Sequence, residues 1–191
     1  MLRLAASFVL GYHGCDRAVA DRLLSGEPFR PSANDYDWLG GGIYFWEANP
    51  QRGLAFAERA SLRPRSGIQT PSVVGAIIDL GACLDLTTAN GVATVLEAHS
   101  SLSRQMTAAE STMPVNQDSL RRQLDCAVIE HVHLIYDRMN ARIDSVRGVF
   151  TEGRPIYAGS GFDEETHIQI AVRNPNCIKG VFRVPEAHLA R

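Results

Sequence analysis

The feature that most constrains the fold is the position of the short runs of valine, isoleucine and aromatic residues. They occupy residues 7–15, 42–46, 72–86, 145–150, 166–172 and 177–184, toward the two ends of the chain. Most are bounded by glycine, proline, asparagine or aspartate, which is typical of strands, and residues 72–86 hold one strand or two. None approaches the roughly 18 apolar residues that a membrane-spanning helix needs.

Segments whose apolar residues recur at helical spacing lie between these runs. Four segments predict helices: residues 16–26, 49–62, 91–106 and 125–139. The second has Asn49 as an N-cap candidate, Pro50 at the first helical position and Leu62 as the last member of its apolar stripe. In the fourth, apolar positions recur every three or four residues, with His131 on that stripe and Met139 at its end. We therefore expect an α+β fold in a single domain spanning residues 1–191.

Composition limits the functional classes. The 191 residues are 45% hydrophobic and 21% charged, as in an ordinary globular domain. The 19 basic and 21 acidic residues give a net charge of −2, so no overall field attracts nucleic acid or anionic lipid. A local groove for nucleic acid stays open.

The cysteines and the N-terminus indicate a cytoplasmic protein. Cys15, Cys83, Cys126 and Cys177 are widely spaced and form no paired ligand motif, which predicts free thiols in a reducing compartment. The first residues imitate a signal sequence, but the apolar stretch is short and no small-residue cleavage motif follows it. We interpret this stretch as the first strand.

Two local motifs suggest chemistry that the pattern does not favour. His131 and His133 stand two residues apart, so they could chelate a metal together only if they lay on an extended strand. The apolar spacing of this segment predicts a helix, on which the two side chains point in nearly opposite directions. No metal is expected. His13 and Cys15 suggest a base and a nucleophile, yet no orienting acid accompanies them. The glycine clusters at 40–42 and 159–161 lack the spacing of a phosphate-binding loop and predict tight turns.

Three stretches in a fixed order carry more information: "GYHGC" at the end of the first strand, "WLGGGIYF" at the second, and "THIQIAVRNP" near the C-terminus. This series resembles the ADP-ribosyltransferase superfamily, in its diphtheria-toxin-like and poly-ADP-ribose-polymerase-like branch. The resemblance covers the residues up to about 60 and those from about 146 onward. It implies a split antiparallel sheet with flanking helices, and a helical middle insertion that no motif matches.

The resemblance also implies roles for residues in binding NAD. His13 would hydrogen-bond a ribose hydroxyl, Gly14 would offer its backbone to the carboxamide, and Tyr44 would stack on nicotinamide. Phe56 would cover the other face of that ring, with simple core packing as the alternative. Further contacts are expected by position from the two motifs and the loop between them: Cys15, Arg30, Ser32, Asn34, Tyr36 and Gly42.

The chemistry explains why such residues are grouped. Cleavage of the bond between nicotinamide and ribose needs a bent dinucleotide, a clamped nicotinamide and stabilisation of an oxocarbenium ion. Catalysis then rests mainly on positioning and electrostatics. The hypothesis requires His13, Tyr44 and the third motif to line one cleft.

The third motif departs from the family pattern. With Pro175 on the family's proline, Gln169 stands where a glutamate is usual. Glutamine can hydrogen-bond the sugar but cannot take a proton. Glu165, and after it Glu164, are alternative sources of charge, while alternation places Gln169 on the same strand face as His167.

The resemblance implies an NAD-dependent mono-ADP-ribosyltransferase that modifies a nucleic acid or a protein and releases nicotinamide. Small domains of this kind are often toxins of toxin–antitoxin or phage-defence systems, so a neutralising protein partner is expected and a membrane is not. Two alternatives stay open: a non-catalytic module that binds NAD or ADP-ribose, and an NAD glycohydrolase that uses water.

Overall fold

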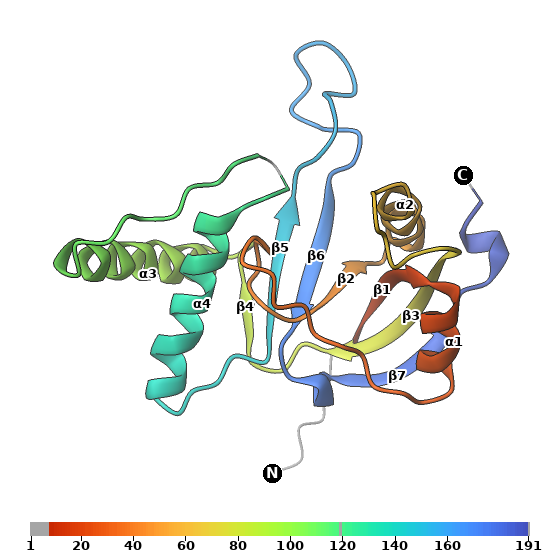
Figure 1. The fold of residues 1–191 in the computed structure, drawn as a ribbon, viewed down its shortest axis with the longest axis horizontal. Helices are drawn as coiled ribbons and strands as arrows, with labels where there is room; N and C mark the ends of the chain where they lie inside the picture. The colour runs from red at the N-terminus through yellow and green to blue at the C-terminus, as the bar shows by residue number, and fades with distance from the viewer. Residues whose placement is uncertain (1–7, 119, 191) are drawn as a thin grey trace.

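The computed structural model describes residues 8–118 and 120–190, which form one α+β fold (Figure 1). The strands are β1 (Phe8–Asp16), β2 (Ile43–Glu47), β3 (Pro71–Asp79), β4 (Cys83–Asp85), β5 (Ser145–Phe150), β6 (His167–Val172) and β7 (Ile178–Arg183). The helices are α1 (Arg17–Leu24), α2 (Pro50–Ser61), α3 (Ala89–Ala108) and α4 (Gln123–Arg138), with two short 3-10 helices, Pro175–Cys177 and Glu186–His188. The predicted α+β class is confirmed. Among the described residues, no helix combines the length and apolar character needed to span a bilayer.

The helix starts follow from local chemistry, and the helix ends are where two expectations fail. Asp16 and Asn49 cap α1 and α2 by accepting hydrogen bonds from first-turn N–H groups, and Pro50 takes the first position of α2. Leu62 and Met139, expected on apolar stripes, lie just past their helices and are 85% and 67% exposed.

One seven-stranded sheet runs through the molecule in the order β4-β5-β6-β2-β1-β3-β7. The neighbouring strands are antiparallel except for the parallel pair β4 and β5. The segment between that parallel pair holds α3, α4 and their connection, because a parallel crossover needs a long return path. We refer to this segment, residues 86–144, as the insertion.

The sheet parts between β1 and β2. These strands pair at Gly11–Glu47 and Tyr12–Trp46 and then separate, whereas β1 pairs with β3 over its whole length. Figure 1 shows β1, β3 and β7 running at an angle to β4, β5 and β6 as a result. The sheet therefore consists of two halves joined at a short central ladder.

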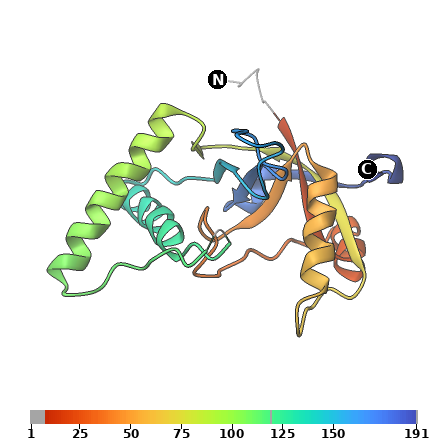
Figure 2. The ribbon, with the colours of Figure 1, turned by 90° about the horizontal axis from the view of Figure 1, so that it is seen from above.

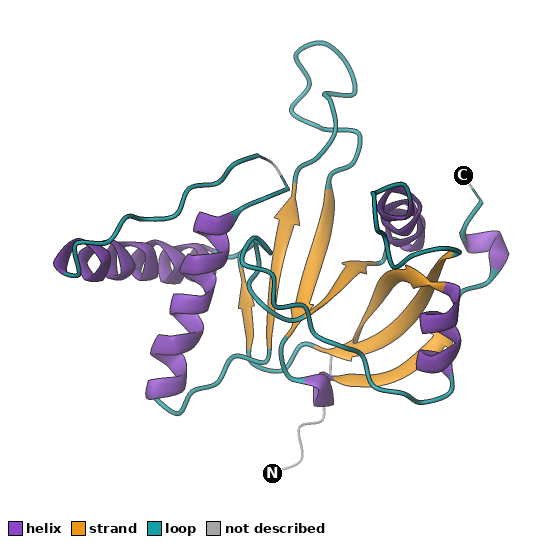
Figure 3. Cartoon of the chain, in the orientation of Figure 1, coloured by secondary structure: helices purple, strands orange, loops and turns teal. Residues whose placement is uncertain are grey.

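The helices cover the two faces unequally. Cys15 and Val74 pack with α1, whereas Tyr12 and Val73 pack near Leu54 of α2, so α1 and α2 lie on opposite faces of the β1–β3 half. The cluster around α3 and α4 takes in side chains from the α2 face. Figure 2 shows α3 and α4 at one end of the molecule and α1 and α2 at the other, while Figure 3 shows the long loops between them.

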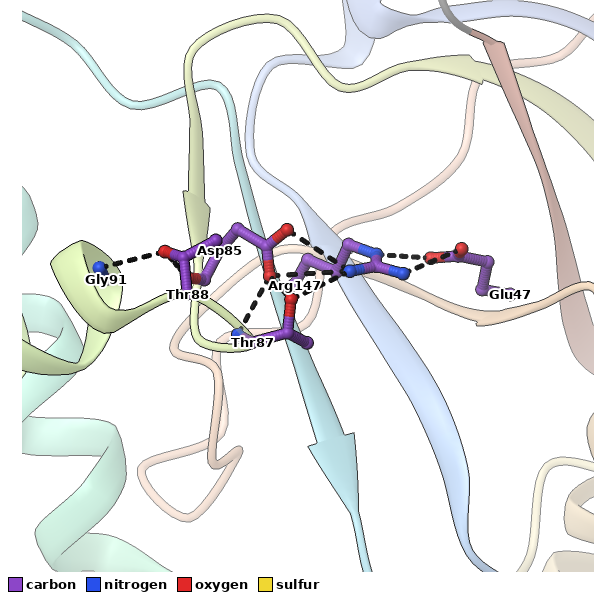
Figure 4. Close-up of polar contacts among 6 residues, drawn as sticks. All are labelled: Glu47, Asp85, Thr87, Thr88, Gly91 and Arg147. Carbon is purple, nitrogen blue, oxygen red and sulfur yellow. Dashed lines mark hydrogen bonds and ion pairs between the residues drawn. The ribbon is translucent and has the colours of Figure 1, made fainter.

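An ion-pair network joins three strands of the half-sheet that contains β4, β5, β6 and β2 (Figure 4). Arg147 of β5 donates to both carboxylate oxygens of Glu47 on β2, at 2.6 and 3.0 Å, reaching across β6. Its Nη1 donates to Asp85 of β4 at 3.2 Å and to the Thr87 hydroxyl at 3.3 Å. The guanidinium and the Glu47 carboxylate are less than a fifth exposed, so water compensates poorly for loss of either partner.

Replacing Arg147 by methionine should lower the free energy of unfolding by about 2 kcal/mol, because two largely buried carboxylates, those of Glu47 and Asp85, lose their shared donor. Urea unfolding followed by circular dichroism measures this change. The control is Arg142→Met. The Arg142 side chain is 88% exposed, and its Nε is 3.9 Å from the Asp137 carboxylate, which makes a long and weak ion pair. Equal stability of the Arg147→Met protein and the wild type would show that the network does not hold the half-sheet together.

Candidate functional site

The three sequence motifs lie on neighbouring strands. His13 is on β1, Tyr44 on β2 and Gln169 on β6, and these strands are adjacent in the order β6-β2-β1. Residues about 125 positions apart in the sequence are thus brought together, as in the pairing of Tyr44 with Ala171.

His13 bridges the two halves of the sheet where their ladder ends. Its Nδ1 lies 2.9 Å from the carbonyl oxygen of Tyr44, and because that oxygen only accepts, Nδ1 carries the proton. Phe29 and Phe45 pack on the ring with centroids at 5.3 and 5.7 Å. Burial lowers the pKa of His13, although the bond to the Tyr44 carbonyl opposes this. The imidazole is neutral at pH 7, and its Nε2 remains an acceptor.

A cleft of about 320 Å³ lies beside His13. It is formed by the end of β1, by α1, by residues 27–30 and by residues 67–68. Among the expected NAD contacts, His13, Gly14, Cys15 and Arg30 line it. The lining charges are balanced, with Asp16 and Glu27 against Arg22 and Arg30.

A second hollow of about 490 Å³ lies farther along the loop between α1 and β2, which also lines the first hollow. Its lining includes residues 31–35, Gly41, Gly42, Cys126, Glu130 and Arg173. Ser32, Asn34 and Gly42 are the expected NAD contacts found here. Successive stretches of the loop between α1 and β2 therefore line two hollows, whereas Tyr36 lines neither and is 38% exposed.

Tyr44 points to the other face of the sheet. Its hydroxyl donates to the Gly40 carbonyl at 2.8 Å and accepts from the Leu39 N–H at 3.0 Å. The ring packs with the cluster under α3 and α4, and burial raises the pKa of the phenol. Because Tyr12 pairs with Trp46, the side chains of His13 and Tyr44 alternate onto opposite faces, and only the Tyr44 backbone meets the imidazole.

Gln169 and Glu165 are both engaged by neighbours. The Gln169 side chain lies on the Tyr44 face, and its Oε1 accepts from the Trp38 indole at 2.6 Å. Glu165 pairs with Arg59 at 2.5 Å and with Arg52 at 3.2 Å, and the hydrogen bond from Arg59 lowers its pKa. Neither residue lines the cleft beside His13. Glu164 pairs with Arg154 at 3.6 Å, away from the cleft-lining residues.

Phe56 and Gly14, both expected to contact NAD, pack against other parts of the protein, and this packing is enough to explain why these residue types stand there. Phe56 stacks against Trp46, with ring centroids 4.9 Å apart. Gly14 lies against α2, because a Cβ built on it would fall 2.0 Å from the Gly53 carbonyl oxygen. The three motif strands are therefore neighbours in the sheet, but His13 lines one hollow while Tyr44 and Gln169 face the opposite side. The expectation that these three side chains line a single cleft is therefore wrong for this structure.

The alternative chemistries receive little support from the geometry. Burial and the charge of Asp16 raise the pKa of Cys15 to about 11, so its thiol stays protonated at neutral pH and is a poor nucleophile. His131 and His133 lie on α4, and His131 Nε2 contacts the Ser101 hydroxyl at 3.1 Å. No cluster of three or more potential metal ligands occurs in residues 8–118 and 120–190.

A clamp that the sequence motifs did not indicate holds the glycine turn before β2. Glu130 of α4 accepts from the Gly41 N–H at 2.7 Å and forms a two-pronged ion pair with Arg173 at 2.7 and 3.0 Å. Gly40, with φ +76°, turns the chain there and gives its carbonyl to the Tyr44 hydroxyl. The insertion thus contributes to the position of Tyr44. The "EHVH" and "VRNP" stretches contain both clamp residues, but nothing in either stretch predicts the pairing.

Comparison with known proteins adds one partial likeness. No family model matches the chain, and no solved structure matches it significantly. The chain is similar to an uncharacterized protein of Methanocaldococcus jannaschii, 47% identical over 36 residues. The match covers 19% of this chain and 17% of that relative, so the chain spans much less than two thirds of its length.

Glu130→Ala should lower the free energy of unfolding by about 1 kcal/mol and speed hydrogen exchange of the Gly41 amide, because that amide and Arg173 lose their acceptor.

Burial by itself raises the pKa of Glu130, but Arg173 and the Gly41 N–H bring it below the ordinary value. The clamp therefore stabilises the protein above the unfolded pKa of about 4.3, and this stability is lost as the pH falls through the folded pKa. The stability difference between the wild type and Glu130→Gln should shrink from pH 7 to about pH 3. A difference that is constant over this range would contradict the clamp.

Proposed function

We propose that the protein is an NAD-dependent mono-ADP-ribosyltransferase that transfers ADP-ribose to a macromolecular acceptor and releases nicotinamide. The observation that carries the proposal is the meeting of the three motif strands at the parting of the sheet, where the His13 imidazole bonds the Tyr44 carbonyl. A split antiparallel sheet with flanking helices is what the resemblance to ADP-ribosyltransferases implies. The type of fold is part of the proposal.

The groups around His13 fit a dinucleotide. The unprotonated Nε2 of His13 suits a ribose hydroxyl donor, and Arg30 offers a cationic fork for a pyrophosphate. Arg22, whose Nε lies 3.4 Å from the Glu27 carboxylate, would have to exchange that partner for a phosphate. An extended ligand can continue along residues 28–35 from the first hollow toward the second. A ligand beside His13 would lie on the face of the sheet opposite to the Tyr44 ring and would find only the Tyr44 backbone near the imidazole.

These residues would act mainly by positioning. His13 would orient the ribose, and the arginines would hold the phosphates so that the glycosidic bond to nicotinamide is exposed. The Trp38 indole holds Oε1 of Gln169, so the amide N–H groups are the donors that Gln169 could offer to a sugar. Bound NAD would supply the activated glycosidic bond.

The state of the third motif favours a second candidate, a non-catalytic module that binds NAD or ADP-ribose. Gln169 is committed to Trp38, and the charge of Glu165 is offset by two arginines, so no carboxylate on this strand is placed to stabilise an oxocarbenium ion. The two candidates share the binding residues and differ in turnover.

The widely spaced cysteines support a cytoplasmic location, and the resemblance supports a role as a toxin of a toxin–antitoxin or phage-defence system. Its acceptor would be a nucleic acid or a protein, and a neutralising protein would bind it in the producing cell.

Incubation with NAD should release nicotinamide, and His13→Ala should lower the rate by about 10²-fold, because one positioning hydrogen bond is lost at the reacting sugar. Chromatography of nicotinamide measures the rate. The matched control is His99→Ala, since His99 is an exposed histidine on α3. NAD carrying a label in its ADP-ribose, added with total RNA, DNA or cell lysate, identifies the acceptor.

Other results would point elsewhere. Thermal stabilisation by NAD without nicotinamide release identifies the binding module. Release that labels no macromolecule identifies a glycohydrolase. A wild-type chain that neither binds nor cleaves NAD would end the proposal.

A further inference from the structure

The hollow beside His13 is not lined by the aromatic residues that the resemblance assigns to nicotinamide. Tyr44 and Phe56 belong to the opposite face of the sheet, where Tyr44 packs under α3 and α4 and Phe56 lies against Trp46. Among the described residues that line the hollow, Phe29 is the one aromatic side chain besides the His13 imidazole. A flat ring that enters this hollow therefore meets Phe29.

Phe29 is held in place by the core although it belongs to the loop between α1 and β2. It packs against two clusters of buried residues, the one that contains Phe45 and the one that contains Cys15. Its ring stands at 87° to the His13 imidazole and at 67° to the Phe45 ring, with the centroids 5.3 Å apart in both pairs. Neither neighbour is stacked parallel on Phe29, and the residue is only partly buried. The core thus fixes the orientation of a ring that also lines the hollow.

The nicotinamide ring of NAD has the charge that suits such a partner. It carries a positive charge until its bond to ribose breaks, and a cation is attracted to the face of a phenyl ring. Because burial lowers the pKa of His13, its imidazole is neutral and does not repel this cation. Asp16 and Glu27 add negative charge to the same lining.

We propose that the nicotinamide ring of NAD stacks on Phe29, and that Phe29 makes the hollow selective for the oxidised, cationic form of that ring. This inference rests on the proposed function and names a binding residue for it. His13 Nε2 then meets the ribose attached to the ring, and Arg30, the next residue in the chain, meets the phosphates. NADH carries a neutral nicotinamide ring and gains less from Phe29.

The test compares Phe29→Leu with Phe182→Leu in the full chain. Phe182 is a matched control, because it is also a partly buried phenylalanine beside another ring, that of Tyr12, but it lies on β7 and does not line the hollow. The ligands are NAD, NADH and ADP-ribose, which has no nicotinamide. Titration calorimetry in the cold, where cleavage is slow, measures the three affinities.

The wild type should bind NAD about 5-fold more tightly than NADH, because only the oxidised ring is a cation. Phe29→Leu should bind NAD about 10-fold more weakly than the wild type and ADP-ribose within about 2-fold of it, since only the contact to nicotinamide is lost. Phe182→Leu should match the wild type for all three ligands.

Two further readouts separate stacking from a structural role. Phe29→Leu should raise the KM for NAD about 10-fold and change kcat by less than about 2-fold, because the ring loses its charge as the bond breaks and the contact stabilises bound NAD more than the transition state. In proton NMR spectra, the ring current of Phe29 should shift the nicotinamide protons upfield when NAD binds. Phe29→Tyr should keep this shift, and Phe29→Leu should lose it.

The possible failures can be told apart. A wild type that binds NAD, with Phe29→Leu binding it equally well, overturns the role of Phe29 and leaves the proposed function in place. Weaker NAD binding by Phe56→Leu but not by Phe29→Leu places nicotinamide on the opposite face and also overturns the inference. Equal loss of NAD and ADP-ribose binding makes Phe29 a structural residue.

The inference stays testable if Phe29→Leu fails to fold. A wild type that binds NADH as tightly as NAD then overturns it without any variant. A wild type that binds neither NAD nor ADP-ribose overturns both this inference and the proposed function.

Discussion

The hydrogen bond between the His13 ring and the Tyr44 carbonyl is the contact on which the proposed site depends. β1 and β2 stop pairing after Tyr12 and Trp46, and a backbone carbonyl in the interior needs a donor once its ladder ends. The imidazole supplies that donor, so the two halves can separate without leaving the group unsatisfied. The same bond fixes the tautomer and leaves Nε2 as an acceptor.

The insertion between β4 and β5 does more than fill space beside the sheet. Through Glu130 and Arg173 it fixes the glycine turn before β2, and that turn receives the Tyr44 hydroxyl. On the opposite face, Arg147 joins β2 to β5 and β4. The strand carrying Tyr44 is thus held by charges on both faces, each reaching in from a distant part of the chain.

The elements of this fold could be predicted from local pattern, but their register could not. Runs rich in valine and isoleucine predicted the strands, and Asn49 with Pro50 predicted the start of α2. Side-chain alternation predicted that His167 and Gln169 share one face of their strand. The opposite facing of His13 and Tyr44 depends on the pairing of β1 with β2, which no local signal specifies. The Glu130 clamp escaped prediction because the docking of α4 creates it. The Trp38 bond to Gln169 escaped prediction because it joins a loop to a strand 131 positions away.

The position of β6 has a consequence for biosynthesis. It fills the space between β5 and β2, so both strands keep a bare hydrogen-bonding edge until residues 167–172 have left the ribosome. A nascent chain stalled after α4 would expose the Tyr44 strand to pairing with other chains. Proteins of this shape would accordingly need rapid completion, or shielding by a chaperone, to escape aggregation during translation.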